Sequence, residues 1–274
     1  MEHYDILIIG GGMVGATLAR ALRGQGLRIG MVEAVHFDAR EEPGYDDRAI
    51  AVAHGTRRIF DGLQLWDRLL DDATPIHQIH VSDRGHFGFT RMTREEEDLP
   101  ALGYVVPARA IGRVLDDAVR EDSAVDTYCP AVLRHISSDD SSARVDIEQD
   151  GVMLSLTAQL VVAADGADSP VREQFGIEAA VTDYHQTAIV TNITPQLPHK
   201  NIAYERFTGT GPLALLPMSE QRCAVVWTVA TEQADEVMQM SDSVFLARLQ
   251  ERFGFRLGRL QRAGRRQAWP LRLV

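Results

Sequence analysis

Three consecutive glycines follow directly on a short apolar segment, residues 5–9, near the start of this chain. Glycine loses more conformational freedom on folding than any other residue, so a cluster of glycines marks a sharp bend or a close approach of the backbone. Apolar residues then recur at helical spacing over residues 14–22, and residues 27–33 form a second strand-length segment that ends in an acid. Strand, glycine turn, helix and strand in this order predict a βαβ unit of a parallel sheet.

Gly10, Gly12 and Gly15 have the spacing of a dinucleotide-binding fingerprint. In that pattern the first glycine permits the turn, the second lets a diphosphate approach the backbone, and the third allows close packing of helix on strand. Glu33 lies 18 residues past Gly15, where a carboxylate can accept hydrogen bonds from ribose and disfavours a 2′-phosphate. We therefore predict a dinucleotide other than NADP at this turn. The fingerprint does not distinguish NAD from FAD, and a purely structural glycine turn is the alternative.

Composition narrows the class of protein. The 274 residues leave room for two domains, and the net charge of −11 argues against a general nucleic-acid-binding protein. Two cysteines, Cys129 and Cys223, are too few for a disulfide framework and favour a reducing compartment. The acid Glu2 precedes the first apolar run, unlike in a signal peptide, and no run reaches the ~18 apolar residues of a membrane span. We expect a cytoplasmic protein.

The remaining pattern mixes helices and strands. Residues 56–73 and 108–122 have helical periodicity, and residues 76–83 and 86–92 predict a strand pair that turns at Arg84–Gly85. From about residue 180 onward, strand-like segments alternate with turn signals. This change of pattern predicts a second part of the chain that is built mainly on a sheet.

A second loop follows another apolar strand, residues 160–164. It carries Asp165–Gly166, and then Ser169–Pro170, which are the signals for the N-cap and the first position of a helix. On this Asp-Gly loop the chain resembles the class A flavoprotein monooxygenases, whose second fingerprint serves FAD and the pyridine nucleotide. Residues 47–51, Asp-Arg-Ala-Ile-Ala, resemble the arginine motif that lies beside the flavin in that family, and Arg109 matches a further flavin-contacting position more loosely. The resemblance implies FAD as cofactor, with NADPH or NADH as electron donor, bound without a second Rossmann domain.

Three further segments are similar to the ubiquinone-biosynthesis branch of this family: residues 81–88, 204–218 and 222–227. This resemblance implies a hydroxylase that inserts one oxygen atom of O2 into a polyprenylated phenol. The family's third motif, which holds the ribityl chain and the flavin ring, does not occur before Val274. We therefore expect a C-terminally truncated form with weak flavin retention.

The resemblance also implies a fold, of the mixed α/β class. A FAD-binding, Rossmann-like domain of the glutathione-reductase type would comprise residues 1–70 and 104–178. A sheet-based substrate domain would comprise residues 71–103 and 179–274. Within the latter, Leu215, Pro217 and Met218 are candidates for an apolar substrate pocket, although ordinary core is the alternative. No residue is singled out as catalytic base.

Two further patterns concern histidines and arginines. His77 and His80 are three residues apart in a predicted strand and so point to opposite faces, which argues against a metal site. Seven arginines and no acid occur in the last 23 residues. They suit either a solvated or acid-paired surface, which we favour, or a peripheral contact with anionic headgroups of the inner membrane. Rival functions are a flavin dehydrogenase or reductase on the same fold, and a non-catalytic subunit of a quinone-synthesis assembly.

Overall fold

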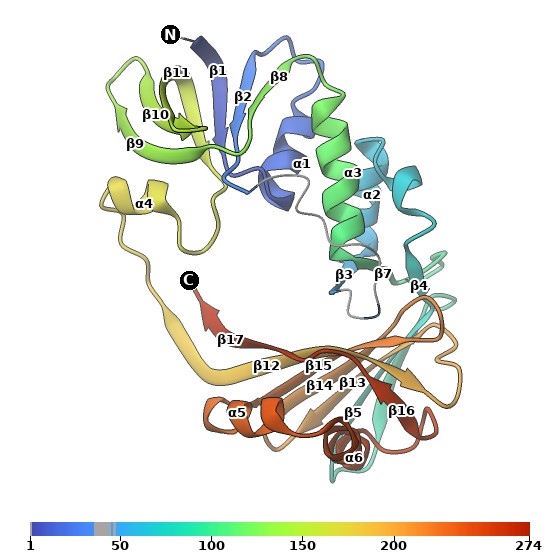
Figure 1. Ribbon diagram of the computed structural model, residues 1–274. Helices are drawn as coiled ribbons and strands as arrows, with labels where there is room; N and C mark the ends of the chain where they lie inside the picture. Colours follow the sequence, from blue (N-terminus) through green and yellow to red (C-terminus); the bar gives the residue numbers. More distant parts are fainter. Residues whose placement is uncertain (1, 36–44, 46–47) are drawn as a thin grey trace. The chain divides into compact units, whose positions relative to one another are not determined.

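The computed structural model describes residues 2–35, 45 and 48–274 of the chain. It comprises two compact units (Figure 1). The first consists of residues 1–41 and 111–180 with Val274, and the second of residues 42–110 and 181–273. The domains expected from the sequence differ from these units, because they place residues 42–70 and 104–110 in the FAD-binding domain. Those domain bounds stay a prediction.

The first unit is built on a six-stranded sheet whose order is β8-β2-β1-β11-β10-β9. Four neighbouring strands are parallel, and β10 and β9 continue the sheet in antiparallel fashion. Their bounds are β1 Glu2–Ile9, β2 Ile29–Val32, β8 Val125–Tyr128, β9 Val132–Ser138, β10 Ala143–Gln149 and β11 Val152–Ala163. The long strand β11 therefore pairs with β1 on one side and with β10 on the other. Together with helix α1 (Met13–Ala21), which packs against β1 and β2, this confirms the predicted βαβ unit.

Helix α3 (Ala108–Arg120) shows the apolar stripe that its sequence predicts. Ile111, Val114, Leu115 and Ala118 are buried at the i, i+3, i+4 and i+7 positions of one face. The short helix α4 (Pro170–Gln174) follows the second loop and begins at the predicted Ser169–Pro170 signals.

The second unit contains an eight-stranded sheet of order β16-β12-β15-β14-β13-β5-β6, with β17 also paired to β12. The predicted strand pair forms β5 and β6, and Gly85 in its turn has φ +89°. The bounds are β5 Gln78–Asp83, β6 Phe89–Thr93, β12 Thr182–Pro195, β13 Ile202–Thr208, β14 Gly211–Pro217, β15 Cys223–Ala230, β16 Leu260–Ala263 and β17 Gln267–Leu273. The sheet-rich second part of the chain is thus confirmed.

A smaller three-stranded sheet, β3-β7-β4, accompanies it (β3 Ala49–Ala53, β7 Gly103–Pro107, β4 Thr74–Ile76). The single helix expected over residues 56–73 is wrong in its extent. Helix α2 spans His54–Gly62, and a separate 3₁₀ turn spans Trp66–Leu69. Gln64 between them has φ +58°, a left-handed conformation that interrupts a right-handed helix.

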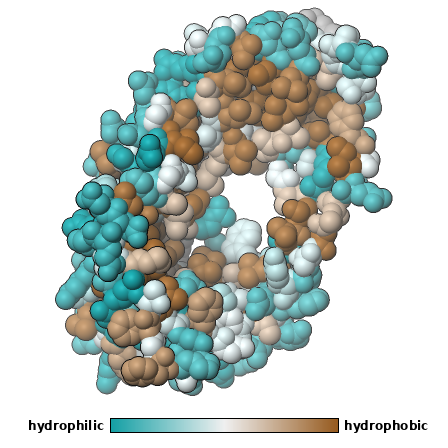
Figure 2. Space-filling view, turned by 180° about the vertical axis from the view of Figure 1, so that it is seen from behind, coloured by the Kyte–Doolittle hydropathy of each residue, from teal (hydrophilic) through white to brown (hydrophobic). Residues whose placement is uncertain are grey.

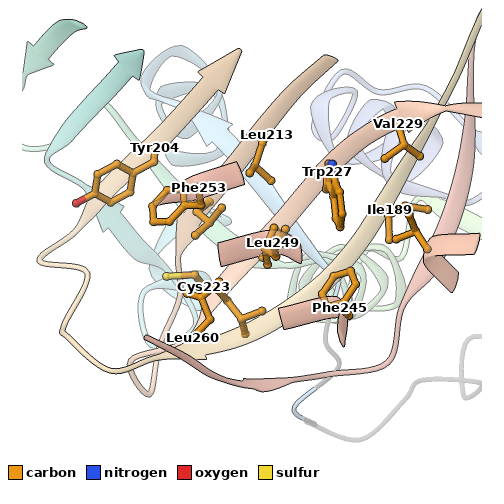
Figure 3. Close-up of a cluster of buried hydrophobic side chains, with 14 of the residues drawn as sticks. Ile189, Tyr204, Leu213, Cys223, Trp227, Val229, Phe245, Leu249, Phe253 and Leu260 are labelled. Carbon is orange, nitrogen blue, oxygen red and sulfur yellow. The ribbon is translucent and has the colours of Figure 1, made fainter. Parts of the chain in front are cut away.

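The core of the second unit lies between the large sheet and two helices, α5 (Thr231–Gln239) and α6 (Asp242–Phe253) (Figure 3). Trp227 of β15 packs at 5.7 Å from Phe245, and Tyr204 of β13 meets Phe253 edge-on at 5.3 Å between ring centroids. These aromatic contacts fix α6 on the sheet. Among the described residues, no helix is both long and apolar enough to cross a membrane.

Candidate functional site

The glycine turn after β1 is shaped by two glycines that have no room for a side chain. Gly10 has φ +102°, and a Cβ there would lie 2.4 Å from the carbonyl oxygen of Ala164. A Cβ on Gly15 would lie 1.9 Å from the carbonyl oxygen of Gly10. Gly12 differs, because a Cβ there would meet nothing within 4 Å. Gly10 and Gly15 therefore build the turn, whereas Gly12 leaves open space beside it.

This open space lies at the N-terminus of helix α1. Gly12 is the N-cap residue, no side chain caps the helix, and the first turn holds no acidic residue. The first turn of a helix presents backbone N–H groups without intrahelical partners and about half a positive charge. The turn therefore offers an anion, such as a diphosphate, both hydrogen-bond donors and a favourable field.

Glu33 lies directly after β2 and is held against the glycine turn. Its Oε2 atom accepts a hydrogen bond from the Gly11 N–H at 2.6 Å, and its Oε1 atom accepts one from the Val35 N–H at 2.7 Å. A carboxylate oxygen has two lone pairs, so each oxygen keeps capacity for a further donor such as a ribose hydroxyl. Both backbone bonds hold the carboxylate in one orientation.

The second loop lies beside the glycine turn because β11 runs parallel to β1. Ile9 and Ala163 are register partners, and the Ala164 N–H donates to the Ile9 carbonyl at 2.7 Å. The Asp165 carboxylate accepts from the Val171 N–H at 3.1 Å, and Gly166 has φ +92°. Gly10, Glu33 and Ala164 thus follow the carboxyl ends of three neighbouring parallel strands, the edge at which such sheets bind ligands.

These segments enclose a pocket of ≈ 450 Å³ in the first unit. It brings together five of the predicted site residues: Gly10, Gly12, Glu33, Asp165 and Gly166. Gly15 lies behind Gly10 and supports it rather than lining the pocket. Sequence reasoning missed the rest of the lining, most of which is apolar and part of which comes from β9: Ile9, Val32, Ala34, Val35, Ala131, Val132, Leu133, Ala164 and Pro170.

The two predicted arginines belong to the second unit and have protein partners there. The Ala108 N–H donates to the Arg48 carbonyl at 2.7 Å, so Arg48 and Arg109 come from adjoining backbone. The Arg48 guanidinium lies 5.6 Å from the centroid of the Trp269 ring, and Arg109 pairs with Asp72 at 3.5 Å. Asp47, the other charged residue of the predicted arginine motif, lies outside the described residues. A flavin contact for Arg48 and Arg109 stays a prediction.

The three candidate substrate-pocket residues have different surroundings. Leu215 is fully buried in the core under α5 and α6, which favours the core alternative for it. Met218 lies in a separate apolar cluster with Ile76, Val105, Ala203 and Ala224. The Met218 carbonyl accepts from the buried His199 ring at 2.9 Å, which fixes the end of β14 after Pro217. Pro217 and Met218 stay pocket candidates.

No group of His, Cys, Asp and Glu that could hold a metal ion occurs in the part of the chain that the structure describes. His80 is buried, and its pKa is lowered by that burial and by the positive charges of Arg256, Arg91 and Arg206. His80 stacks on Phe89 at 5.1 Å and packs against Tyr204, so it is part of the aromatic packing of the second unit.

Comparison with known proteins agrees with this geometry. A family model described as "FAD binding domain" matches residues 3–272. The chain is 34% identical to ubiquinone hydroxylase UbiL of Rhodospirillum rubrum, covering 98% of this chain and 62% of that protein. It is 30% identical to ubiquinone hydroxylase UbiM of Neisseria meningitidis, covering 98% and 59%. It is 26% identical to 3-demethoxyubiquinol 3-hydroxylase of Escherichia coli, covering 94% and 65%. The chain therefore spans less than two thirds of the length of these relatives.

Solved structures show the same fold. The p-nitrophenol 4-monooxygenase PnpA of Pseudomonas putida superimposes with a TM-score of 0.77 at 19% identity, covering 99% of this chain and 69% of that one. The flavin-dependent monooxygenase PieE, solved with FAD and substrate, gives a TM-score of 0.76 at 20% identity, covering 98% and 50%. The predicted α/β architecture, a FAD-binding Rossmann-like part with a sheet-based second part, is thereby confirmed.

Proposed function

This chain belongs to the family of FAD-binding domains. On that premise we propose that it acts as a FAD-dependent aromatic hydroxylase. The reaction inserts one oxygen atom of O2 into the ring of a polyprenylated phenol in ubiquinone biosynthesis. Within that branch, residues 81–88, 204–218 and 222–227 resemble 2-octaprenyl-6-methoxyphenol hydroxylase. Three relatives that are named ubiquinone or demethoxyubiquinol hydroxylases support this choice of substrate class.

The observation that carries the proposal is the pocket at the glycine turn. The open space at Gly12, beside the uncapped N-terminus of α1, fits the diphosphate of FAD. The Glu33 carboxylate, held by Gly11 and Val35, would accept hydrogen bonds from the ribose of the adenosine part. Asp165 and Gly166 also line the pocket. The residues present therefore fit the adenine-dinucleotide part of FAD.

FAD, when bound and reduced by NADPH or NADH, supplies the oxygen-activating chemistry. The chain's own part is to bind and orient. Glu33 carries a negative charge where a 2′-phosphate would lie, so the reducing nucleotide would not compete well for this pocket if it is NADPH. We assign residues 1–70 and 104–178 to FAD binding. We assign residues 71–103 and 179–274 to substrate binding. Arg48 and Arg109, whose backbones adjoin, are proposed as further flavin-binding residues.

Product analysis under labelled oxygen tests this function. The purified protein would be supplied with FAD, reduced pyridine nucleotide, a prenylated phenol and ¹⁸O2. We expect one labelled oxygen atom in the ring, and loss of both FAD and product in Gly12→Ala, where the new Cβ would occupy the diphosphate position. Flavin reduction without ring label would instead favour a dehydrogenase or reductase. A protein that neither binds nor reduces flavin would favour the non-catalytic subunit.

A further inference from the structure

Three exposed phenylalanines gather at one end of the large sheet in the second unit. Phe87 at the tip of the β5–β6 hairpin is fully exposed (110%), and Phe255 after α6 is 70% exposed. Phe89 at the start of β6 is 59% exposed. Phe207 of β13 is exposed as well, but it is in register with Asp83 while Phe89 is in register with Ser82, so Phe207 lies on the other face of the sheet. We call Phe87, Phe89 and Phe255 the phenylalanine patch. Exposed aromatic groups that cluster in this way mark an interaction surface.

Backbone and side-chain contacts bring the two segments of the patch, the β5–β6 hairpin and the end of α6, to the same end of the unit as the end of β13. Strand β13 runs parallel to β5, with Phe207 in register with Asp83. The Arg84 N–H at the hairpin tip donates to the Phe207 carbonyl at 2.9 Å. The Arg84 guanidinium pairs at 3.3 Å with Glu251 in the last turns of α6. Hairpin tip, end of β13 and end of α6 are therefore neighbours.

The patch rests on a continuous series of ring contacts. Phe89 stacks on His80 at 5.1 Å, His80 lies 5.8 Å from Tyr204, and Tyr204 meets Phe253 at 5.3 Å. The last of these rings precedes Phe255 by two residues. Because the inner rings are buried, the exposed ones stand on a packed base rather than on a loose loop.

Four arginines border the patch. The Arg91 guanidinium lies 4.5 Å from the centroid of the Phe89 ring. Arg206 and Arg256 each donate an Nη1 hydrogen bond to the Phe253 carbonyl, at 2.8 and 3.2 Å, and Arg84 completes the group. Burial lowers the pKa of Arg206, and the positive charges of Arg256 and Arg84 lower it further, which shows how closely these cations lie. The acids beside them are Glu251, paired with Arg84, and Asp83, paired with His86 at 2.8 Å.

Negative charge lies at the other end of the hairpin. The sequence Glu-Glu-Glu-Asp at residues 95–98 follows the end of β6 that is remote from the tip. The chain as a whole has a net charge of −11, whereas the hairpin tip carries arginines and exposed aromatic rings. On the second unit, in the lower part of Figure 2, hydrophobic side chains lie among strongly hydrophilic ones.

We propose that the phenylalanine patch docks on the surface of a membrane that contains anionic phospholipids. The phenylalanines enter the boundary between headgroups and acyl chains, and the arginines meet lipid phosphates. Charge complementarity favours an anionic membrane surface, because the four arginines surround the projecting apolar tip. The hairpin tip also stands out, with glycines at positive φ on both sides of Phe87, Gly85 and Gly88, rather than lining a groove that would hold a peptide. The proposal is independent of the flavin pocket, since all its residues lie in the second unit.

Sedimentation with vesicles tests the proposal. The purified chain would be mixed with vesicles of phosphatidylcholine alone and of phosphatidylcholine with phosphatidylglycerol. We expect binding to the anionic vesicles, weakened by salt, and a reduction of about 10-fold or more in the double variant Phe87→Ser/Phe255→Ser. Arg91→Gln should weaken binding about 5-fold. The matched control is Phe175→Ser, which removes an exposed phenylalanine (43%) of the first unit and should leave binding unchanged.

Thermal unfolding of each variant would show that it is folded, as expected for side chains this exposed. The proposal is overturned if the wild-type chain fails to sediment with anionic vesicles at low salt, or if the double variant binds as well as wild type. It is also overturned if Phe175→Ser loses as much binding as the double variant. Loss of self-association in the double variant, without an effect on vesicles, would assign the patch to a contact between copies of the chain.

Discussion

The carboxylate of Glu33 accepts a hydrogen bond from the backbone N–H of Gly11 at 2.6 Å. This bond joins the residue after β2 to the glycine turn after β1, so the acid and the turn that would bind one nucleotide hold each other in place. A Cβ on Gly11 would lie 3.0 Å from the Glu33 Cβ, which shows how closely the two segments approach. This hydrogen bond therefore sets the position of the Glu33 carboxylate relative to the candidate nucleotide site.

Alanine at two of the glycines should have opposite consequences. Gly15→Ala places a Cβ against the Gly10 carbonyl oxygen and should lower the free energy of unfolding by about 3 kcal/mol. Gly12→Ala meets nothing within 4 Å and should change stability by no more than about 1 kcal/mol, but weaken FAD binding at least about tenfold. Denaturant unfolding and titration of flavin fluorescence measure the two effects. Equal loss of stability in both variants would contradict the separate roles of the two glycines.

Removing the charge of Glu33 should weaken FAD binding. Glu33→Gln keeps an oxygen that can accept the Gly11 N–H but loses the carboxylate that would receive ribose hydroxyls, so we expect about tenfold weaker binding by calorimetry. The control is Glu148→Gln, which removes a carboxylate that pairs with Arg134 on the antiparallel part of the same sheet. FAD affinity that falls equally in both variants would point to general charge rather than to a ribose contact.

Acidification should destabilise the fold through buried histidines. His199 accepts the Asn201 N–H at Nδ1 and donates from Nε2 to the Met218 carbonyl, an arrangement that requires the neutral ring. Burial lowers the pKa of His199, and burial likewise lowers those of His80 and His77. The unfolded chain therefore binds more protons below about pH 6.5, and stability that is present above this pH is lost as the pH falls.

Urea unfolding at pH 7.5 and pH 5.5 measures this effect, with His199→Gln as the test variant. We expect the variant to be less stable than wild type at the higher pH, by about 1–3 kcal/mol, because a buried polar contact is impaired. Its stability should change less between the two pH values. If the free energy of unfolding of His199→Gln depended on pH as strongly as that of wild type, His199 would not be a cause of the acid destabilisation.

The two cysteines should differ sharply in reactivity. Burial raises the pKa of the Cys223 thiol to about 12, so almost no thiolate forms at neutral pH. Cys129 is half-buried, and its Sγ donates to the Val35 carbonyl at 3.2 Å. We expect a thiol reagent to modify Cys129 in the native protein and Cys223 only after unfolding, with Cys129→Ser as the matched control. Rapid modification of the native Cys129→Ser variant would contradict the burial of Cys223.

Local patterns predicted the local structure well. The glycine spacing, the Ser169–Pro170 helix start and the Gly85 turn were all readable because each depends on the backbone preferences of one or two residues. The helix predicted over residues 56–73 is too long because the helix breaks at Gln64. Glutamine has no preference for the left-handed conformation, so the sequence does not indicate this break. Residues 131–133 of the pocket wall carry no motif, since they reach the site only through the order of the strands.

Strand β11 has a consequence for how the protein is made. Its partners in β1 are 154 positions earlier in the chain, as in the pair Glu2 and Leu156, whereas β2, the other neighbour of β1, ends at Val32. The ribosome must therefore synthesise β11 long after β1 and β2 before β1 finds its second neighbour. Contacts between such distant segments slow folding. One edge of β1 therefore stays unpaired on the nascent chain until β11 is made, and over that interval the chain most needs a chaperone.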